Sequence, residues 1–494
     1  MIDYERLGAM DAAFLDLEDD NHHMHVGGVM IFDAGPLRRE GGGIDIERIR
    51  RTIESRLHLV PRFRQRLAYI PFERLPIWVD DERFRLSYHV RHASLPRPGD
   101  DRELKRLVGR IMSQPLDRSR PLWEMWLIEG LAGDRFALVS KNHHCMVDGV
   151  SAADVMAAIL QPTPDTAIVP PHPWAPRSHP SEARLLFDQL QRRATQATTA
   201  WQAMRTAINH PESAVRTLGQ SFAGVLEAVA PALSPVSETP INVRVGPHRR
   251  FDWLNMDLRD LKAVTRALGG TINDLVLTIT SGALREYFAQ RGIAVNGLEI
   301  RAMVPVALRT GEERGHLGNR LTEIVVPIPV RVADPVARLR AVQRTTANLK
   351  RSRHALGAQV LTTVSEWTVP SLLGQVVRLA SRAGACNLVV TNVPGPQIPL
   401  YLCGAPMRTA YPVVPLFENM GITVGLFSYN GGLFWGVNGD WEAMTDLHEF
   451  QQAIESSFRS LQLAADATAR PRATPRPRRR PAPVVMETRP LRAS

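Results

Sequence analysis

The sequence has little cysteine, very little lysine and no long apolar run. Its three cysteines, Cys145, Cys386 and Cys403, are too few for a disulfide framework and show no paired metal-ligand spacing, which is typical of a reducing compartment. No apolar run approaches the roughly 18–20 residues that span a bilayer. The first residues lack the basic-then-apolar order of a signal peptide. The sequence therefore predicts a cytoplasmic protein without a transmembrane helix.

Positive charge is in excess, but it is concentrated at one end. The net charge is +10, and only four of the 60 basic residues are lysines, a bias typical of GC-rich coding that suggests an actinobacterial source. Residues 466–494 hold eight arginines against Asp466 and Glu487, a net +6, which leaves +4 for the rest. This proline-interrupted tail is predicted to be disordered. The distribution argues against a chain-wide surface for nucleic acid.

Hydrophobic periodicity predicts an α/β protein of two halves. The 494 residues correspond to about three domain-sized units. We expect an N-terminal half over 1–175, a proline-rich and then helical connector over 176–240, a C-terminal half over 241–465 and the tail over 466–494. The predicted strands are 25–32, 122–128, 136–142, 300–306, 323–330, 386–392, 421–429 and 433–438. The predicted helices are 46–59, 104–112, 152–160, 186–208, 213–229, 258–268, 271–290, 335–349 and 446–464.

The stretch His143-His144-Cys145-Met146-Val147-Asp148-Gly149 carries the clearest chemistry. If residues 136–142 form a strand, its period of two places His144 on the apolar face, where a neutral imidazole can act as a base near pH 7. Asp148 and Gly149 form the next turn, in which Asp148 either fixes the histidine tautomer or pairs with an arginine. The alternative is that both histidines are structural, and no spacing supports a zinc site.

A second candidate is Asn273, in the first turn of the helix predicted over 271–290. Thr271 and Asp274 have capping-box spacing. A side-chain amide beside the free N–H groups of a helix start suits developing negative charge. The alternative is that Asn273 and Asp274 merely begin the helix; for Asp274 the structural role is preferred.

Four further residues are candidates for a substrate channel. Pro121 and Trp123 either shape this channel or pack in the core. Asn392 and Gly395 belong to a stretch whose first interpretation is a rigid turn and whose second is a loop that lines the site.

Other features carry less weight. His22, His23 and His25 are expected in a solvated loop that leads into a strand rather than in a metal site. The thiol of Cys145 is not expected to act as a nucleophile. The connector helix is a candidate for peripheral contact with a membrane or lipid droplet, although packing against the two halves is preferred.

The stretch from His143 to Gly149 matches the HHxxxDG signature of acyltransferases that resemble chloramphenicol acetyltransferase. Further stretches narrow the resemblance to the bacterial wax ester synthase/acyl-CoA:diacylglycerol acyltransferase family. These stretches are Leu7 to Leu15, Met24 to Gly28, Arg120-Pro121-Leu122-Trp123-Glu124, Thr271-Ile272-Asn273-Asp274 and Val390 to Pro396. The resemblance covers nearly the whole chain except the connector and the tail.

The resemblance implies a fold, a reaction and a set of site residues. The fold would be two chloramphenicol-acetyltransferase-like halves with the active site at their interface. The enzyme would transfer a long-chain acyl group from acyl-CoA to diacylglycerol or a long-chain alcohol, with His144 as general base and no acyl-enzyme. His143, Asp148 and Asn273 would be further catalytic residues, and Gly149 would belong to the motif. Acyl-CoA would be a substrate, so neither cofactor nor metal is expected.

Three alternatives remain at this point. A related condensation-type enzyme would take its acyl group from a carrier protein, and the sequence shows no adjoining carrier domain. A non-catalytic relative would bind lipid with the same fold, which the intact His144, Asp148 and Gly149 argue against. Nucleic-acid binding through the tail would leave the motif unexplained. The sequence gives no indication of acyl chain length, acceptor preference or oligomeric state.

Overall fold

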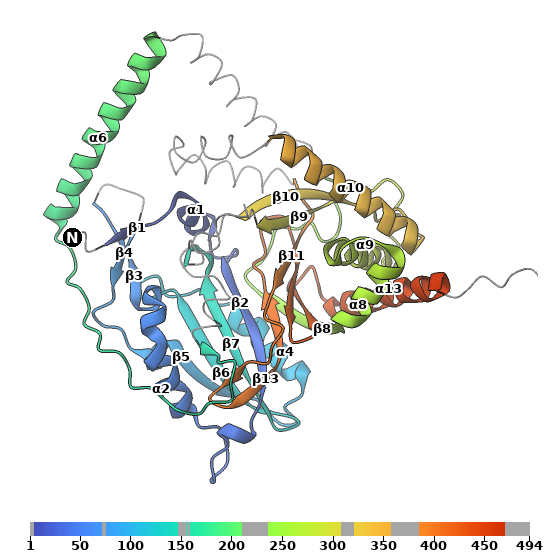
Figure 1. Cartoon of the computed structure of the whole chain (residues 1–494), viewed down its shortest axis with the longest axis horizontal. Helices are drawn as coiled ribbons and strands as arrows, with labels where there is room; N and C mark the ends of the chain where they lie inside the picture. Colours follow the sequence, from blue (N-terminus) through green and yellow to red (C-terminus); the bar gives the residue numbers. More distant parts are fainter. Residues whose placement is uncertain are drawn as a thin grey trace, which may run out of the picture.

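The computed structural model describes residues 4–71, 76–146, 156, 159–209, 236–307, 321–356 and 385–469. Within these residues the chain forms two six-stranded sheets and one three-stranded sheet, surrounded by helices (Figure 1). The predicted α/β class is confirmed. Among the described residues, no helix is both long enough and apolar enough to cross a membrane.

The N-terminal sheet has the strand order β12-β13-β2-β7-β6-β5. Its strands are β2 (His25–Asp33), β5 (Val90–Ser94), β6 (Trp123–Leu131), β7 (Arg135–His143), β12 (Tyr401–Leu402) and β13 (Ala405–Val413). The predicted hairpin of β6 and β7 is present, and Gly133 and Asp134 take the positive φ angles that its tight turn needs. Strand β7 lies in the middle of this sheet and is buried on both faces, as the adjacent and oppositely directed side chains of Leu138 and Val139 illustrate.

The second large sheet has the order β10-β9-β11-β14-β15-β8. Its strands are β8 (Arg249–Asp257), β9 (Ile300–Ala307), β10 (Leu321–Ile328), β11 (Leu388–Pro394), β14 (Ile422–Tyr429) and β15 (Gly432–Asp440). The predicted hairpin of β14 and β15 turns at Asn430 and Gly431, whose φ angles of 42° and 86° suit the right-handed twist of the strands. This turn causes little backbone strain because Asn and Gly tolerate positive φ.

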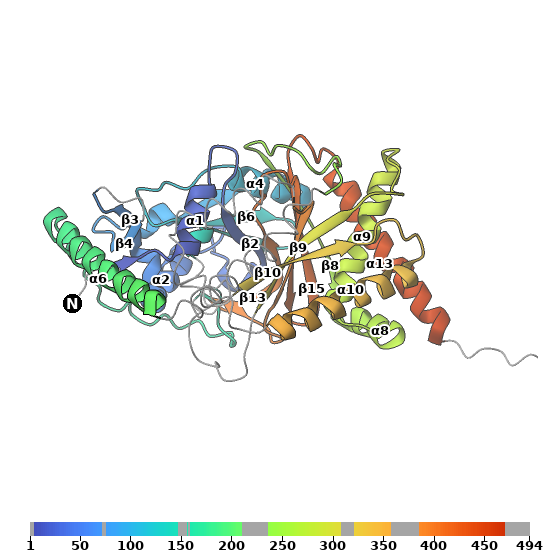
Figure 2. The same cartoon turned by 90° about the horizontal axis from the view of Figure 1, so that it is seen from above.

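Four helices cover the face of the second sheet that points away from the N-terminal sheet (Figure 2). They are α8 (Leu258–Leu268), α9 (Ile272–Gln290), α10 (Pro335–Leu356) and α13 (Leu447–Ala469). Helix α13 continues to Ala469, so the first residues assigned to the tail are helical. The remainder, 470–494, lies outside the described residues, as does the helix predicted over 213–229.

Strands β12 and β13 come from the C-terminal part of the chain but belong to the N-terminal sheet. Strand β13 pairs antiparallel with β2, from Met407 opposite Phe32 to Val413 opposite Gly27. The predicted division at residue 241 did not anticipate this exchange. It ties the two large sheets together, because a Cβ on Gly436 of β15 would lie 1.9 Å from the carbonyl oxygen of Pro412.

A second close contact, between helix α4 (Asp101–Met112) and β8, joins the N-terminal part of the fold to the second large sheet. A Cβ on Gly109 would lie 2.7 Å from the carbonyl oxygen of Arg249, so glycine permits this close approach. The Arg249 amide donates a hydrogen bond to Ser113 Oγ (2.8 Å). One apolar core therefore spans both large sheets and includes Val139 of β7 and Trp253 of β8.

The connector helix α6 (Glu182–Asn209) is anchored at its start. Leu185 is buried in the small cluster over the three-stranded sheet of β1 (Glu5–Arg6), β3 (Gln65–Tyr69) and β4 (Pro76–Asp80). Farther along, Phe187, Leu190 and Trp201 are each about two-thirds exposed (66%, 66% and 65%). The preferred packing of this helix against both halves is therefore wrong for these three side chains. Helix α6 projects away from the large sheets (Figure 1).

Candidate active site

The two motif histidines lie where β7 ends. His143 is the last residue of β7, pairs in register with His25 of β2, and is completely buried. His144 begins the 3-10 turn η4 (His144–Met146), one residue beyond the strand. The amide of His143 donates to the Leu122 carbonyl (2.9 Å), and the amide of His144 donates to the Met24 carbonyl (2.7 Å). Backbone hydrogen bonds from two directions therefore fix both residues.

The His144 ring is held against helix α1 (Ala9–Leu17). It stacks on Phe14 with ring centroids 3.8 Å apart, and its Nδ1 atom is buried without a hydrogen-bond partner in the described part of the chain. Burial lowers the pKa of His144 to about 4, because a cation in this apolar setting loses its hydration. The ring is therefore neutral near pH 7 and able to accept a proton.

His143 has a different environment from its neighbour. The amide of Cys145 donates to Nδ1 of His143 (3.1 Å), while Nε2 lies 3.4 Å from Oε2 of Glu18. An acceptor Nδ1 carries no proton, so the ring proton belongs on Nε2, which faces the carboxylate. His144, the candidate base, and His143, which faces a carboxylate, thus have separate surroundings.

Glu18 is a site residue that sequence reasoning missed. It follows helix α1 directly, and its side chain is only 8% exposed. Its carboxylate pairs with Arg118 (2.8 Å) and faces the rings of His143 and His25. Although burial opposes ionisation, His143 and Arg118 together lower the pKa of Glu18 to about 2. No spacing links residue 18 to residue 143, so only the tertiary structure reveals the contact.

The histidines near the start of β2 are buried, which corrects the prediction of a solvated loop. His22, His23 and His25 are 5%, 4% and 2% exposed. Burial lowers the pKa of His23 to about 4 and that of His25 well below its usual value. The physical reason is tertiary: His25 pairs with His143 of β7, and His23 lies close enough to Arg249 and Lys141 for their charges to lower its pKa, contacts that local sequence does not encode. Among the described residues, no cluster of His, Cys, Asp or Glu has the geometry to hold a metal ion.

Cys145, the next residue of the motif, is chemically unreactive in its surroundings. Cys145 is buried, and burial raises the pKa of its thiol well above its usual value, which suppresses the nucleophilic thiolate. Asp148 and Gly149 lie outside the described residues, as does most of the helix predicted over 152–160. Their roles stay predictions.

Asn273 and Asn392 meet on the second sheet. Asn273 is the second residue of α9, whose N-cap Thr271 forms the predicted capping box with Asp274. The Nδ2 atom of Asn392, on β11, donates to Oδ1 of Asn273 (2.7 Å). Asp274 is buried and also accepts from Thr346 Oγ1 (2.7 Å), the surroundings of a structural residue. In the described part of the chain, no contact joins the asparagine pair to the histidines.

The other channel candidates have core-like surroundings. Trp123 is fully buried: its Nε1 donates to the Phe63 carbonyl (2.8 Å), and its ring stacks between Phe63 and His89. Pro121 is also buried. A Cβ on Gly395 would lie 2.3 Å from the Phe427 ring, so only glycine fits there. A channel role for these residues stays a prediction.

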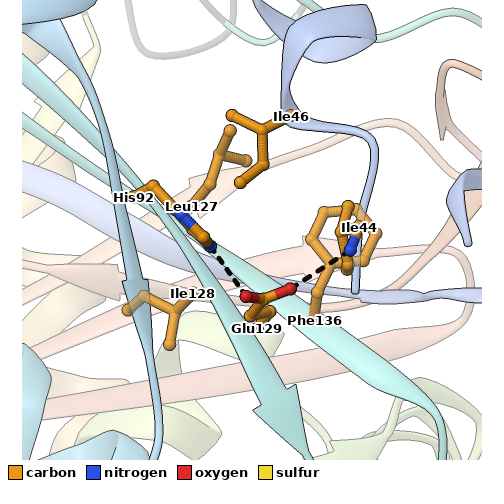
Figure 3. A pocket seen from close by; sticks show the side chains of 7 residues that line it. All are labelled: Ile44, Ile46, His92, Leu127, Ile128, Glu129 and Phe136. Atoms are coloured by element: carbon orange, nitrogen blue, oxygen red, sulfur yellow. Dashed lines mark hydrogen bonds and ion pairs between the residues drawn. The ribbon is translucent and has the colours of Figure 1, made fainter. Parts of the chain in front are cut away.

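A hollow lies between the N-terminal sheet and the chain around Ile44, but it is smaller than a typical ligand pocket. It has about 150 Å³ of empty space, below the roughly 300–1,000 Å³ of ligand pockets. The Glu129 carboxylate occupies it, facing His92 (3.0 Å) and accepting from the Ile44 amide (3.1 Å; Figure 3). Its lining residue Phe136 lies at the opposite end of β7 from His143.

The fold places the chain among enzymes built from two such lobes. It matches the starter condensation domain of rhizomide synthetase with a TM-score of 0.55 and 13% identity, over 94% of this chain and 95% of that one. It also matches the wax ester synthase/diacylglycerol acyltransferase of Marinobacter aquaeolei VT8 with a TM-score of 0.67 and 26% identity, over 93% of this chain and all of that one. The class is therefore that of the two-lobed acyltransferases and condensation domains, as predicted.

Sequence relationships define the family. Residues 7–276 match the model of the wax ester synthase/diacylglycerol acyltransferase catalytic domain, and residues 317–462 match that of the family's C-terminal domain. A Mycobacterium tuberculosis protein that carries the name diacylglycerol O-acyltransferase is 31% identical over 473 residues, which cover 94% of this chain and 91% of the relative. The chain belongs to the wax ester synthase/diacylglycerol acyltransferase family and is an O-acyltransferase, which confirms the predicted family and enzyme class.

Proposed function

We propose that this protein transfers a long-chain acyl group from acyl-CoA to the hydroxyl group of diacylglycerol or a long-chain alcohol, with His144 as the general base. The observation that carries the proposal is the state of His144. Its ring is neutral, stacked on Phe14, and fixed through its amide at the end of a central strand. The family and the names of the relatives support the substrate class.

The proposed reaction needs one base and no covalent enzyme intermediate. A ring nitrogen of His144 takes the hydroxyl proton as the acceptor oxygen attacks the thioester carbonyl. The tetrahedral oxyanion then collapses, the carbon–sulfur bond breaks, and the CoA thiolate takes the proton back from the imidazolium. A positioned base supplies about 10²- to 10⁴-fold of rate, so oxyanion stabilisation and orientation must supply the rest.

Asn273 is the proposed partner for the oxyanion. Because Asn392 donates to its Oδ1 atom, the Nδ2 donor of Asn273 points away from that bond and remains available. The first turn of α9 adds free N–H groups and the positive end of the helix dipole. Asp148 and Gly149 are proposed to shape the turn after His144.

Helix α6 is the proposed contact with a lipid surface. Phe187, Leu190 and Trp201 are exposed, and burying such side chains contributes about 1.5–3 kcal/mol each. This contact would be peripheral. It would bring the acyltransferase to the membrane or lipid droplet that holds its acceptor.

An assay with two acceptors tests the function. Purified protein is incubated with labelled palmitoyl-CoA and either diolein or hexadecanol, and ester formation is measured. We expect ester from the wild type, and a rate about 10²- to 10⁴-fold lower for His144→Ala, since the variant lacks the base. His92→Ala is the matched control, because this histidine pairs with Glu129 at the far end of the sheet.

Three outcomes would contradict the proposal. Ester formation that survives in His144→Ala would remove His144 as the base. If the wild type forms no ester with either acceptor but does so from a carrier-protein thioester, the enzyme is of the condensation type. A wild type that binds lipid without turnover under both conditions is a non-catalytic relative.

A further inference from the structure

Glu18 connects parts of the site that are distant in sequence. Its Oε1 accepts from the Met24 amide (3.3 Å) and faces Nε2 of His25 (3.5 Å). Its Oε2 accepts from Arg118 (2.8 Å) and faces Nε2 of His143 (3.4 Å). Four groups thus converge on one carboxylate that is only 8% exposed.

Two routes lead from Glu18 to His144. One runs through Met24: its amide donates to Glu18, and its carbonyl accepts from the His144 amide (2.7 Å). The other runs through His143, whose Nε2–H faces the carboxylate while its Nδ1 accepts from the amide of Cys145. The residues on both sides of His144 are therefore fixed by groups that contact Glu18.

Helix α1 brings a third constraint to the same place. Phe14 stacks on the His144 ring and lies four residues before Glu18, which places the two side chains near the same face of the helix end. The Glu18 amide donates to the Phe14 carbonyl (3.2 Å), which fixes the position of one relative to the other. A shift of Glu18 would therefore also move the ring that packs on His144.

From these contacts we infer that Glu18 is a positioning residue for acyl transfer: it holds His143 in the Nε2–H tautomer and thereby fixes the turn that presents His144. This inference rests on the proposed role of His144. The carboxylate is suited to the task because it only accepts hydrogen bonds. The Met24 amide, the Arg118 guanidinium and the Nε2–H group of His143 face it, and all three are donors. Glu18 itself touches no reacting atom.

The inference is tested with Glu18→Gln and a matched control. A glutamine has one oxygen and one NH₂ group, so in either orientation a donor faces a donor, and the His143 ring must change tautomer or rotate. Asp80→Asn is the control, because the Asp80 side chain is also 8% exposed and also pairs with an arginine, Arg177 (2.9 Å), away from the histidines. Glu18→Asp retains the charge and should recover part of the activity.

Two readouts separate positioning from a loss of stability. We expect kcat to fall about 10- to 100-fold in Glu18→Gln, the usual range for residues that orient a functional group, with less than about a twofold change in KM for palmitoyl-CoA. Nitrogen-15 NMR of histidine-labelled protein should show His143 as the Nε2–H tautomer in the wild type and altered in Glu18→Gln. The His143 signals are identified by their loss in His143→Gln.

The result that would overturn the inference is unambiguous. It fails if His143 keeps the same tautomer in Glu18→Gln, or if kcat falls no further than in Asp80→Asn. The NMR measurement uses the resting protein without substrate. It therefore still decides the role of Glu18 if His144→Ala keeps full activity and the proposed base is rejected.

Discussion

The two regions that carry the candidate residues differ in how they hold them. Around His144 the side chains are buried and ionisable, and contacts between segments more than a hundred residues apart fix them, as with Glu18 and His143. Around Asn273 the contact is between two neutral amides, those of Asn273 and Asn392, and Asn273 itself is exposed at a helix start with a local capping box. A base requires desolvation to stay neutral, whereas an amide donor needs only orientation. Changes of charge and pH should therefore alter stability and activity through the histidine region. Loss of a single hydrogen-bond donor should alter activity through the asparagine region.

Acid should have the largest effect, and it should act on the histidine region. The folded protein lowers the pKa of His23 and His144 to about 4, while the unfolded chain has the usual value near 6.5. Between pH 6.5 and 4 the unfolded state therefore binds more protons, so the free energy of unfolding falls as pH falls. Glu18, with a pKa of about 2, adds to this loss from about pH 4.5 downward.

Thermal melting between pH 7.5 and 4.5 measures this effect. We expect Tm to fall with pH, and to fall less steeply in His23→Gln, whose side chain cannot take up the proton. His172→Gln is a control, because this histidine is exposed. An identical slope in wild type and His23→Gln would show that His23 does not contribute to the acid sensitivity.

Removal of one donor from the asparagine region should have the next largest effect. Asn273→Ala lacks the proposed oxyanion donor, and the loss of such a donor costs about 10²- to 10³-fold in kcat. Fold and Tm should be nearly unchanged, since Thr271 and Asp274 still cap the helix. Steady-state kinetics with palmitoyl-CoA measure the change. Unchanged turnover would leave Asn273 with no role beyond starting helix α9.

The smallest effect is expected for Asn392→Ala. Asn392 contacts Asn273 through one hydrogen bond, so its loss frees the amide of Asn273 to turn without removing the donor. We expect kcat to fall about tenfold or less, since one neutral hydrogen bond contributes about 0.5–1.5 kcal/mol. In Asn273→Ala, the further change Asn392→Ala should have almost no effect. Additive losses in the double variant would show that the two residues act independently.

Sequence reasoning was most accurate where a structure depends on neighbouring residues. The β6–β7 and β14–β15 hairpins and the capping box of Thr271 and Asp274 are present as predicted, because turn residues and caps act within four positions. It failed for His23 and His25, whose local sequence looks polar and exposed. His25 is buried where β2 pairs with β7, and His23 is buried near Lys141 and Arg249, so both are covered by segments over a hundred residues away.

The sequence alone determined the family, the α/β class and the position of the histidine motif, because motifs and periodicity are local properties of the chain. Only the tertiary structure placed β12 and β13 in the N-terminal sheet, brought Asn392 to Asn273 and set Glu18 against His143. These are contacts between distant segments. Burial and shape complementarity select them over many alternatives that the same local patterns would allow.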